Sequence, residues 1–147
     1  GIKGVRGVEG IDPATIRDII VDETHGFTYE TMPRGAIEKL ALFLSLGQVD
    51  MDRYIDRATK VAHGNTNRGA QFYQTICANC HGFDGKEINF KDADNPEYVG
   101  TVGQKNPWES LHKIRFGQPG VGMVSLSVLD IQEQVDILAY TQTLPAE

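Results

Sequence analysis

Two cysteines and a histidine stand together near the middle of the chain, in the run Cys77-Ala78-Asn79-Cys80-His81. They are the only two cysteines in the 147 residues. So short a separation does not suit a disulfide that joins distant parts of a fold. Local chemistry must therefore explain the pair, and three kinds are open: dithiol redox exchange, a metal site, or attachment of a prosthetic group.

Covalent attachment of haem explains this run best. Two thiols at this spacing can reach the two vinyl groups on one edge of a porphyrin, and the next residue then places an imidazole under the iron. A thioredoxin-like pair is expected after a strand, whereas the residues before Cys77 have a helical pattern. A zinc site needs further ligands at compact spacing, and the other histidines are scattered. We predict one haem c per chain, bound by Cys77, Cys80 and His81.

The elements that position these residues are predicted to be helices. Capping side chains and prolines at first helical positions mark the helix starts, and apolar residues three and four apart follow them. No alternating strand pattern occurs, and residues 82–103 form a Gly- and Asp-rich loop. The fold class is therefore all-α. The expected helices begin at Pro13, Pro33, Asp50, Asn67, Pro107 and Ser127, and the third ends near Gly64.

The residues around the motif resemble class I cytochromes c, over about residues 66 to 145. The matching positions are Gly69, Phe72, Tyr73, Cys77, Cys80, His81, Gly82 and Leu138-Ala139-Tyr140. In that family the helix before the motif crosses the C-terminal helix at a small residue and an aromatic residue, which Gly69 and Tyr140 match. The resemblance implies a cytochrome c-like helical fold around one covalent haem. It also implies electron transfer, without catalysis by the chain itself.

The same resemblance implies a methionine as the sixth iron ligand. Met123 is the only methionine after His81, and it stands in a Gly-rich loop between two expected helices. The family usually has proline after this methionine, where this chain has Val124. His112 is the rival ligand, but it falls within an expected helix. We predict His81 and Met123 as the iron ligands.

Two further residues are expected near the haem. Trp108 and Arg115 are predicted to hydrogen-bond a haem propionate, with core packing over the haem edge as the alternative for Trp108. Methionine and histidine together raise the reduction potential, which suits a one-electron carrier between redox proteins. The alternatives are a haem subunit of a larger oxidoreductase and a gas-binding haem sensor, which needs an open sixth position.

Residues 1–62 contain no haem motif, yet they resemble the back half of a cytochrome domain. Their order is a helix, a loop with Met32-Pro33, and an apolar helix around Leu40-Ala41-Leu42. We interpret the chain as the C-terminal part of a two-haem cytochrome c, with a junction at residues 63–68 and the haem domain at residues 69–147. A helical extension is the alternative. The apolar residues of the N-terminal region also predict a homo-oligomer.

Charge and hydropathy limit the partners and the compartment. The net charge of −6 argues against nucleic acid and favours redox partner proteins with basic surfaces. No apolar run reaches the ~20 residues that span a membrane. The first residues show no signal-peptide pattern, which leaves a cytoplasmic chain or a processed one. Because thioether bonds to haem are made after export, we expect a periplasmic protein.

Overall fold

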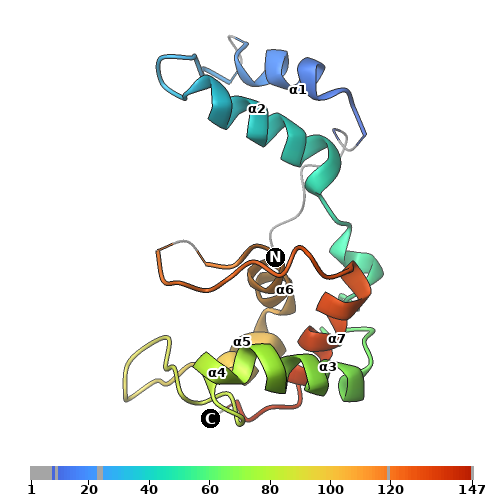
Figure 1. Cartoon of the computed structure of the whole chain (residues 1–147), viewed down its shortest axis with the longest axis vertical. Helices are drawn as coiled ribbons and strands as arrows, with labels where there is room; N and C mark the ends of the chain where they lie inside the picture. The colour runs from blue at the N-terminus through green and yellow to red at the C-terminus, as the bar shows by residue number, and fades with distance from the viewer. Residues whose placement is uncertain (1–7, 9, 23–24, 119, 147) are drawn as a thin grey trace. The chain divides into compact units, whose positions relative to one another are not determined.

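The computed structural model describes residues 8, 10–22, 25–118 and 120–146. They form two compact units that meet in sequence between Asp50 and Met51, and each unit is described by itself. Within these residues the regular elements are helices, and β-pairing is limited to two isolated bridges, Ile55 with Ala62 and Gln118 with Met123 (Figure 1). The predicted all-α class is confirmed.

The N-terminal unit is a pair of helices. Helix α1 spans Pro13–Ile20, and helix α2 spans Arg34–Leu42 and continues as the π-helical turn η1, Phe43–Gly47. Asp12 caps α1 by accepting a hydrogen bond from the Thr15 backbone N–H at 3.2 Å. A small core joins the two helices, and its buried members are Ile16, Ile20, Ile37 and Ala41.

The C-terminal unit contains the motif and its supporting helices. Helix α3 (Thr66–Phe72) continues through a π-helical turn, η3 (Tyr73–Cys77), into α4 (Ala78–His81). A 3₁₀ turn, η2 (Met51–Arg53), precedes them, and α5 (Val99–Lys105), α6 (Pro107–Phe116) and α7 (Ile131–Thr141) follow. Helix α7 packs against α3, α5 and α6. The buried core consists of Ile55, Ala62, Leu111, Ile114, Val135, Ile137, Leu138 and Ala139.

Helices α3 and α7 touch at their backbones. A Cβ atom on Gly69 would collide with the Asp136 carbonyl oxygen and would lie 3.0 Å from the Tyr140 Cβ. The predicted contact between a small residue and an aromatic residue is thus confirmed. The fully buried carboxylate of Asp136 adds a second tie, because it pairs with Arg68 and accepts a hydrogen bond from the Asn65 backbone N–H at 2.8 Å.

The helix predicted from Asp50 to near Gly64 is wrong. Only η2 is helical there, and the chain then turns back so that Ile55 pairs with Ala62. The Asp56 carboxylate causes the turn by accepting hydrogen bonds from the Ala58 and Thr59 backbone N–H groups, at 2.9 and 2.7 Å. Residues 51–62, which we expected in the N-terminal region, therefore pack with the C-terminal unit.

Helix α5 lies at the end of the stretch predicted as loop. Its buried residues are Gly100, Thr101 and Gly103, so it shows no large apolar side chains at helical spacing. Thr101 begins the helix by accepting a hydrogen bond from the Tyr98 backbone N–H at 3.1 Å. The small residues are needed because a Cβ on Gly100 would meet the Leu144 carbonyl oxygen at 2.6 Å.

Candidate functional site

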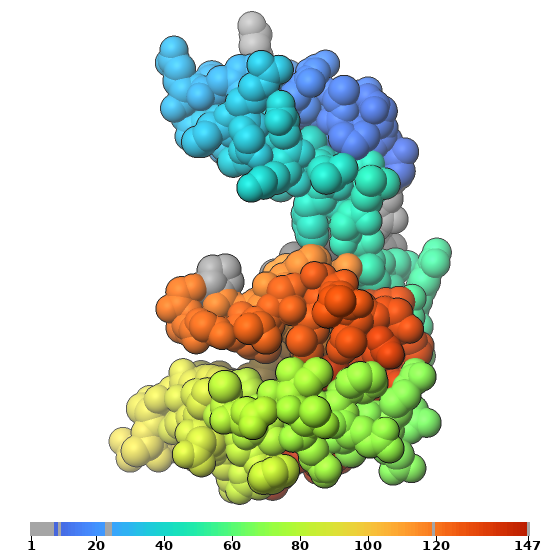
Figure 2. All heavy atoms as spheres, viewed as in Figure 1, coloured from blue at the N-terminus to red at the C-terminus, as the bar shows by residue number. Residues whose placement is uncertain are grey.

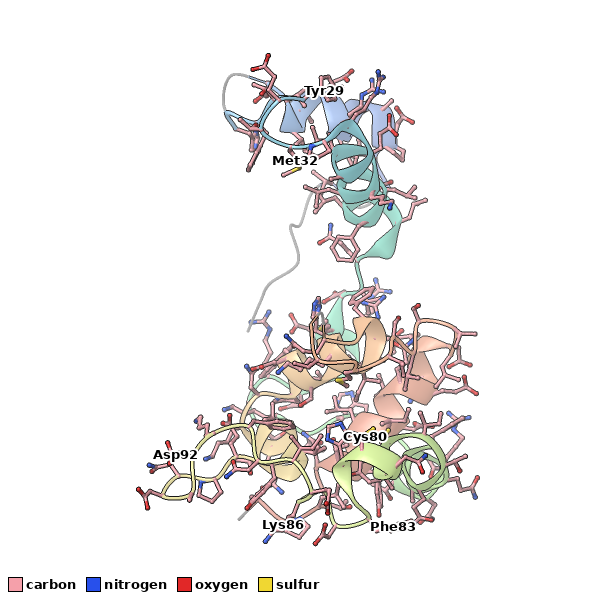
Figure 3. All side chains as sticks on the ribbon, turned by 60° about the vertical axis from the view of Figure 1, so that its left-hand side comes forward. Tyr29, Met32, Cys80, Phe83, Lys86 and Asp92 are labelled. Carbon is pink, nitrogen blue, oxygen red and sulfur yellow. The ribbon has the colours of Figure 1, made fainter. Side chains whose placement is uncertain are left out.

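The two cysteines and the histidine occupy consecutive helical turns. Cys77 ends η3, is half-buried and packs against two core clusters, whereas Cys80 is exposed on α4. His81 ends α4, and Gly82 stops the helix with a φ of 77°, which glycine adopts easily. In Figure 3, Cys80 lies on the side of this segment that faces the rest of the unit.

The imidazole of His81 is half-buried and lacks one hydrogen bond. Its Nδ1 atom is buried and finds no hydrogen-bond partner among the described residues. Burial lowers the pKa of His81, so the ring is neutral near pH 7. A neutral imidazole is a good metal ligand, and a buried polar atom without a partner costs free energy. The motif residues therefore fit a haem that His81 ligates.

Three contacts hold the residues around His81 in place. The Tyr73 hydroxyl donates to the Gly82 carbonyl oxygen at 3.0 Å, and the Glu87 backbone N–H donates to the His81 carbonyl oxygen at 3.0 Å. Burial raises the pKa of Tyr73, which keeps its hydroxyl a donor. The Phe90 ring meets the His81 ring edge-on, with centroids 6.0 Å apart. The imidazole is thus oriented by the protein itself.

The thiol of Cys77 is unsuited to dithiol exchange. Burial raises its pKa to about 11, with a further contribution from Cys80. Reactive dithiols instead have lowered pKa values, because the thiolate is the nucleophile. The helical turn before the motif also differs from the strand that precedes a thioredoxin-like pair. This geometry favours covalent attachment over redox exchange.

Met123 lies in the connection between α6 and α7. Gly117 leaves α6 with a φ of 73°, and the Gln118 backbone N–H then donates to the Met123 carbonyl oxygen at 3.2 Å. The Leu126 backbone N–H donates to the Ile114 carbonyl oxygen at 3.1 Å and ties the loop back to α6. Met123 is half-buried. Figure 2 shows a hollow between this loop, in orange, and the green and yellow residues of the motif segment and of the loop after it.

The other predicted site residues lie on α6. Trp108 is half-buried and packs against the same core cluster as Cys77. Arg115 is half-buried, and burial lowers its pKa; its guanidinium lies 4.6 Å from the centre of the Phe116 ring. The rival ligand His112 also contacts Phe116, with ring centroids 5.0 Å apart, and burial lowers its pKa.

Sequence reasoning missed two supporting residues. Phe90 stands in a loop without periodicity, so nothing in the pattern pointed to its contact with His81. Asp136 sits among apolar residues of α7, and a lone carboxylate there could only have hinted at a buried pair.

Comparisons with known proteins agree with this geometry. The family model for cytochrome c matches residues 66–145, which is more than half of the chain. A stretch of 54 residues is 43% identical to the fructose dehydrogenase cytochrome subunit of Gluconobacter japonicus and covers 35% of this chain and 11% of that subunit. No solved structure matches significantly. With its motif, its α3–α7 contact and the family match over the same residues, the chain belongs to the cytochrome c family.

Proposed function

We propose that the C-terminal unit carries single electrons between redox proteins through one haem c, attached to Cys77 and Cys80 and ligated by His81 and Met123. The observation that carries the proposal is the half-buried imidazole of His81, whose buried Nδ1 has no hydrogen-bond partner among the described residues, beside two free thiols. When bound, haem supplies a reversible one-electron iron couple.

Different residues of the chain would hold different parts of the haem. Cys77 and Cys80 would anchor it, and His81 and Met123 would ligate the iron. Trp108 and Arg115 both lie on α6, where they would contact the porphyrin edge and a propionate. With His81 and Met123 both as ligands, the iron would have no free site for substrate or gas, and the group would supply electron exchange alone. A gas-binding sensor would need the sixth position open.

The net charge and the match to part of a known cytochrome subunit indicate which kinds of redox partner the chain has. The net charge of −6 favours a partner with a basic face around its own redox centre. The match to a cytochrome subunit of a dehydrogenase supports a second candidate role, in which the chain is a haem-bearing part of a larger oxidoreductase. In both roles the chain transfers electrons and does not itself act on substrate. No helix in the described part of the chain is long and apolar enough to cross a membrane.

We also propose that the mature protein works in the periplasm, where thioether bonds to haem are made. Expression with an export signal and a haem-attachment system should give holoprotein. The same chain expressed in the cytoplasm without either should give mostly apoprotein, and full haem loading there would contradict the proposal.

Electrochemistry tests the carrier function directly. The holoprotein should show a reversible one-electron couple, a low-spin spectrum in both oxidation states, and slow or no binding of carbon monoxide to the reduced form. Rapid stoichiometric binding of carbon monoxide would favour the sensor instead. An oxidised protein without the weak near-infrared band of methionine ligation would exclude Met123 as the ligand.

A further inference from the structure

We propose that residues 8–50 are the distal half of a second haem domain, completed in the natural protein by a helical segment that carries its own Cys-x-x-Cys-His motif. The proposal rests on a comparison of the two units within this chain. Only the role given to Met32 depends on the proposed function, because that role requires Met123 to be an iron ligand.

The N-terminal unit repeats the order of the last part of the C-terminal unit. Helix α1 and helix α6 both begin with proline directly after the N-cap residue, which is Asp12 in one and Asn106 in the other. Connections of similar length follow, residues 21–33 and residues 117–130, and each contains one methionine. A second helix then packs back on the first, α2 on α1 and α7 on α6.

The buried positions of the two second helices correspond. Aligning Ala41 with Ala139 places Ile37 at Val135. All four side chains are buried, with exposed fractions of 1%, 5%, 0% and 0%. One alignment therefore places both buried residues of α2 on buried positions of α7.

At two further positions the same alignment pairs residues that differ in burial between the two units. It places Leu42 at Tyr140 and Leu46 at Leu144. Leu144 is only 6% exposed, whereas Leu42 is 51% exposed and Leu46 is 70% exposed. In the C-terminal unit these two positions join a cluster made with the motif segment, whose members are Tyr73, Cys77, Ala78, Val99, Tyr140 and Leu144.

The members of this cluster indicate which kind of segment would cover Leu42 and Leu46 in the N-terminal unit. The residues that cover Tyr140 and Leu144 come largely from η3 and α4, the segment that carries Cys77 and Cys80. This chain has no second such segment, because it has only two cysteines. Another copy of the chain cannot supply one either, since its own segment already covers its own α7. The cover is therefore a separate motif-bearing segment.

Met32 lies where this second haem would take its distal ligand. It is half-buried at the edge of the N-terminal core, in the connection between α1 and α2. Met123 occupies the corresponding connection, although Met32 stands closer to its following helix. If Met123 ligates the first iron, Met32 does the same for the second.

The haem content of the full natural protein tests the proposal. The complete polypeptide, purified with its haem, should yield two covalent haems by pyridine haemochrome assay against protein mass. Peptide mapping should find a second haem peptide outside residues 1–147. A ratio of one haem per complete polypeptide, or no haem peptide outside residues 1–147, would overturn the proposal.

Methionine variants of the same protein test the ligand. The shifted methionine methyl signals in the proton spectrum of the reduced protein should form two sets. Met32→Ala should remove one set, and Met51→Ala, the matched control in the other unit, should remove neither. If Met32→Ala leaves both sets, the role of Met32 fails while the carrier function stands. If Met123→Ala also leaves both sets, the proposed ligation fails.

Discussion

At the scale of single residues, the site depends on a neutral imidazole with a restricted orientation. His81 is held through its carbonyl oxygen and through the edge-on ring of Phe90. Lys113 lies 6.0 Å from the centre of that ring and also pairs with Glu109 at 2.9 Å. The orientation of His81, the proximal ligand that we propose, therefore comes from the loop after the motif as well as from the motif.

Replacement of Met123 by alanine should open the sixth position. We expect high-spin iron or binding of carbon monoxide, and a lower reduction potential, because a methionine ligand raises it. Axial ligands tune haem potentials over ~0.8 V, so a change on the order of 0.1 V is expected. Optical spectra and voltammetry measure both effects. Met51→Ala should leave them unchanged, and an unchanged spectrum in Met123→Ala would assign the ligand to another residue.

At the scale of elements, the haem domain depends on the contact between α3 and α7. The two backbones meet at Gly69, and the buried Asp136 carboxylate links the start of α3 to α7. Because α3 leads directly into η3 and α4, this contact also sets where the motif emerges. Two predictions test its two components.

Gly69→Ala should destabilise the domain, because the added methyl group has no space against the Asp136 carbonyl oxygen. Overpacking of this kind costs about 1–3 kcal/mol. Gly35→Ala is the matched control, since no atom lies within 4 Å of a Cβ built on this helical glycine. The control should gain ~0.5–1 kcal/mol. Urea unfolding of the holoproteins measures both, and equal stability of the two variants would contradict the close contact.

Asp136→Asn should lower the free energy of unfolding by about 1–3 kcal/mol, because a neutral amide replaces the charged acceptor of the Arg68 and Asn65 hydrogen bonds. The exposed Arg34–Glu38 pair gives the control: Glu38→Gln should cost less than ~0.5 kcal/mol. Urea titrations at a series of pH values measure both effects.

The stability that Asp136 contributes should also depend on pH. Burial alone would raise the pKa of Asp136, but hydrogen bonds from Asn65, Arg68 and Gln132 together lower it below the ordinary 3.8. The stabilisation is therefore complete above pH ~4 and is lost as the pH falls through the lowered value. The difference between wild type and Asp136→Asn should shrink in that acid range. A difference that grows on acidification would contradict this sign.

At the scale of the whole molecule, the two units differ in whether they cover the apolar residues at corresponding positions. The C-terminal unit buries Tyr73, Leu138 and Leu144, whereas the N-terminal unit leaves Leu42 and Leu46 exposed. Burying a large apolar side chain is worth about 1.5–3 kcal/mol, so contact of these leucines with another segment or chain is favourable. This difference underlies both the second haem domain that we propose and the association predicted for the isolated chain.

The 147-residue holoprotein on its own should therefore associate through its N-terminal unit. Sedimentation at micromolar concentration should show a dimer or larger species. Leu42→Glu with Leu46→Glu should give a monomer that keeps its haem. Val61→Glu, at a side chain that is 55% exposed in the C-terminal unit, should leave association unchanged. A wild-type chain that is strictly monomeric would contradict the prediction.

The contact of Gly69 with Tyr140 was expected from the resemblance to class I cytochromes c. The sequence by itself determined the haem motif and the helical class. These features depend on short spacings: two thiols and an imidazole must meet one porphyrin edge, and capped apolar periodicity is a property of each helix alone. The sites of Cys77, Cys80 and His81 could therefore be predicted without knowledge of how the helices pack.

Only the tertiary structure decided which segments pack together. It moved residues 51–62 into the C-terminal unit, formed α5 from small residues, and brought Phe90 onto His81. It also showed that Leu42 and Leu46 are exposed where Tyr140 and Leu144 are covered. The physical reason is that burial depends on residues far away in the chain, and local patterns give no measure of those distant contacts.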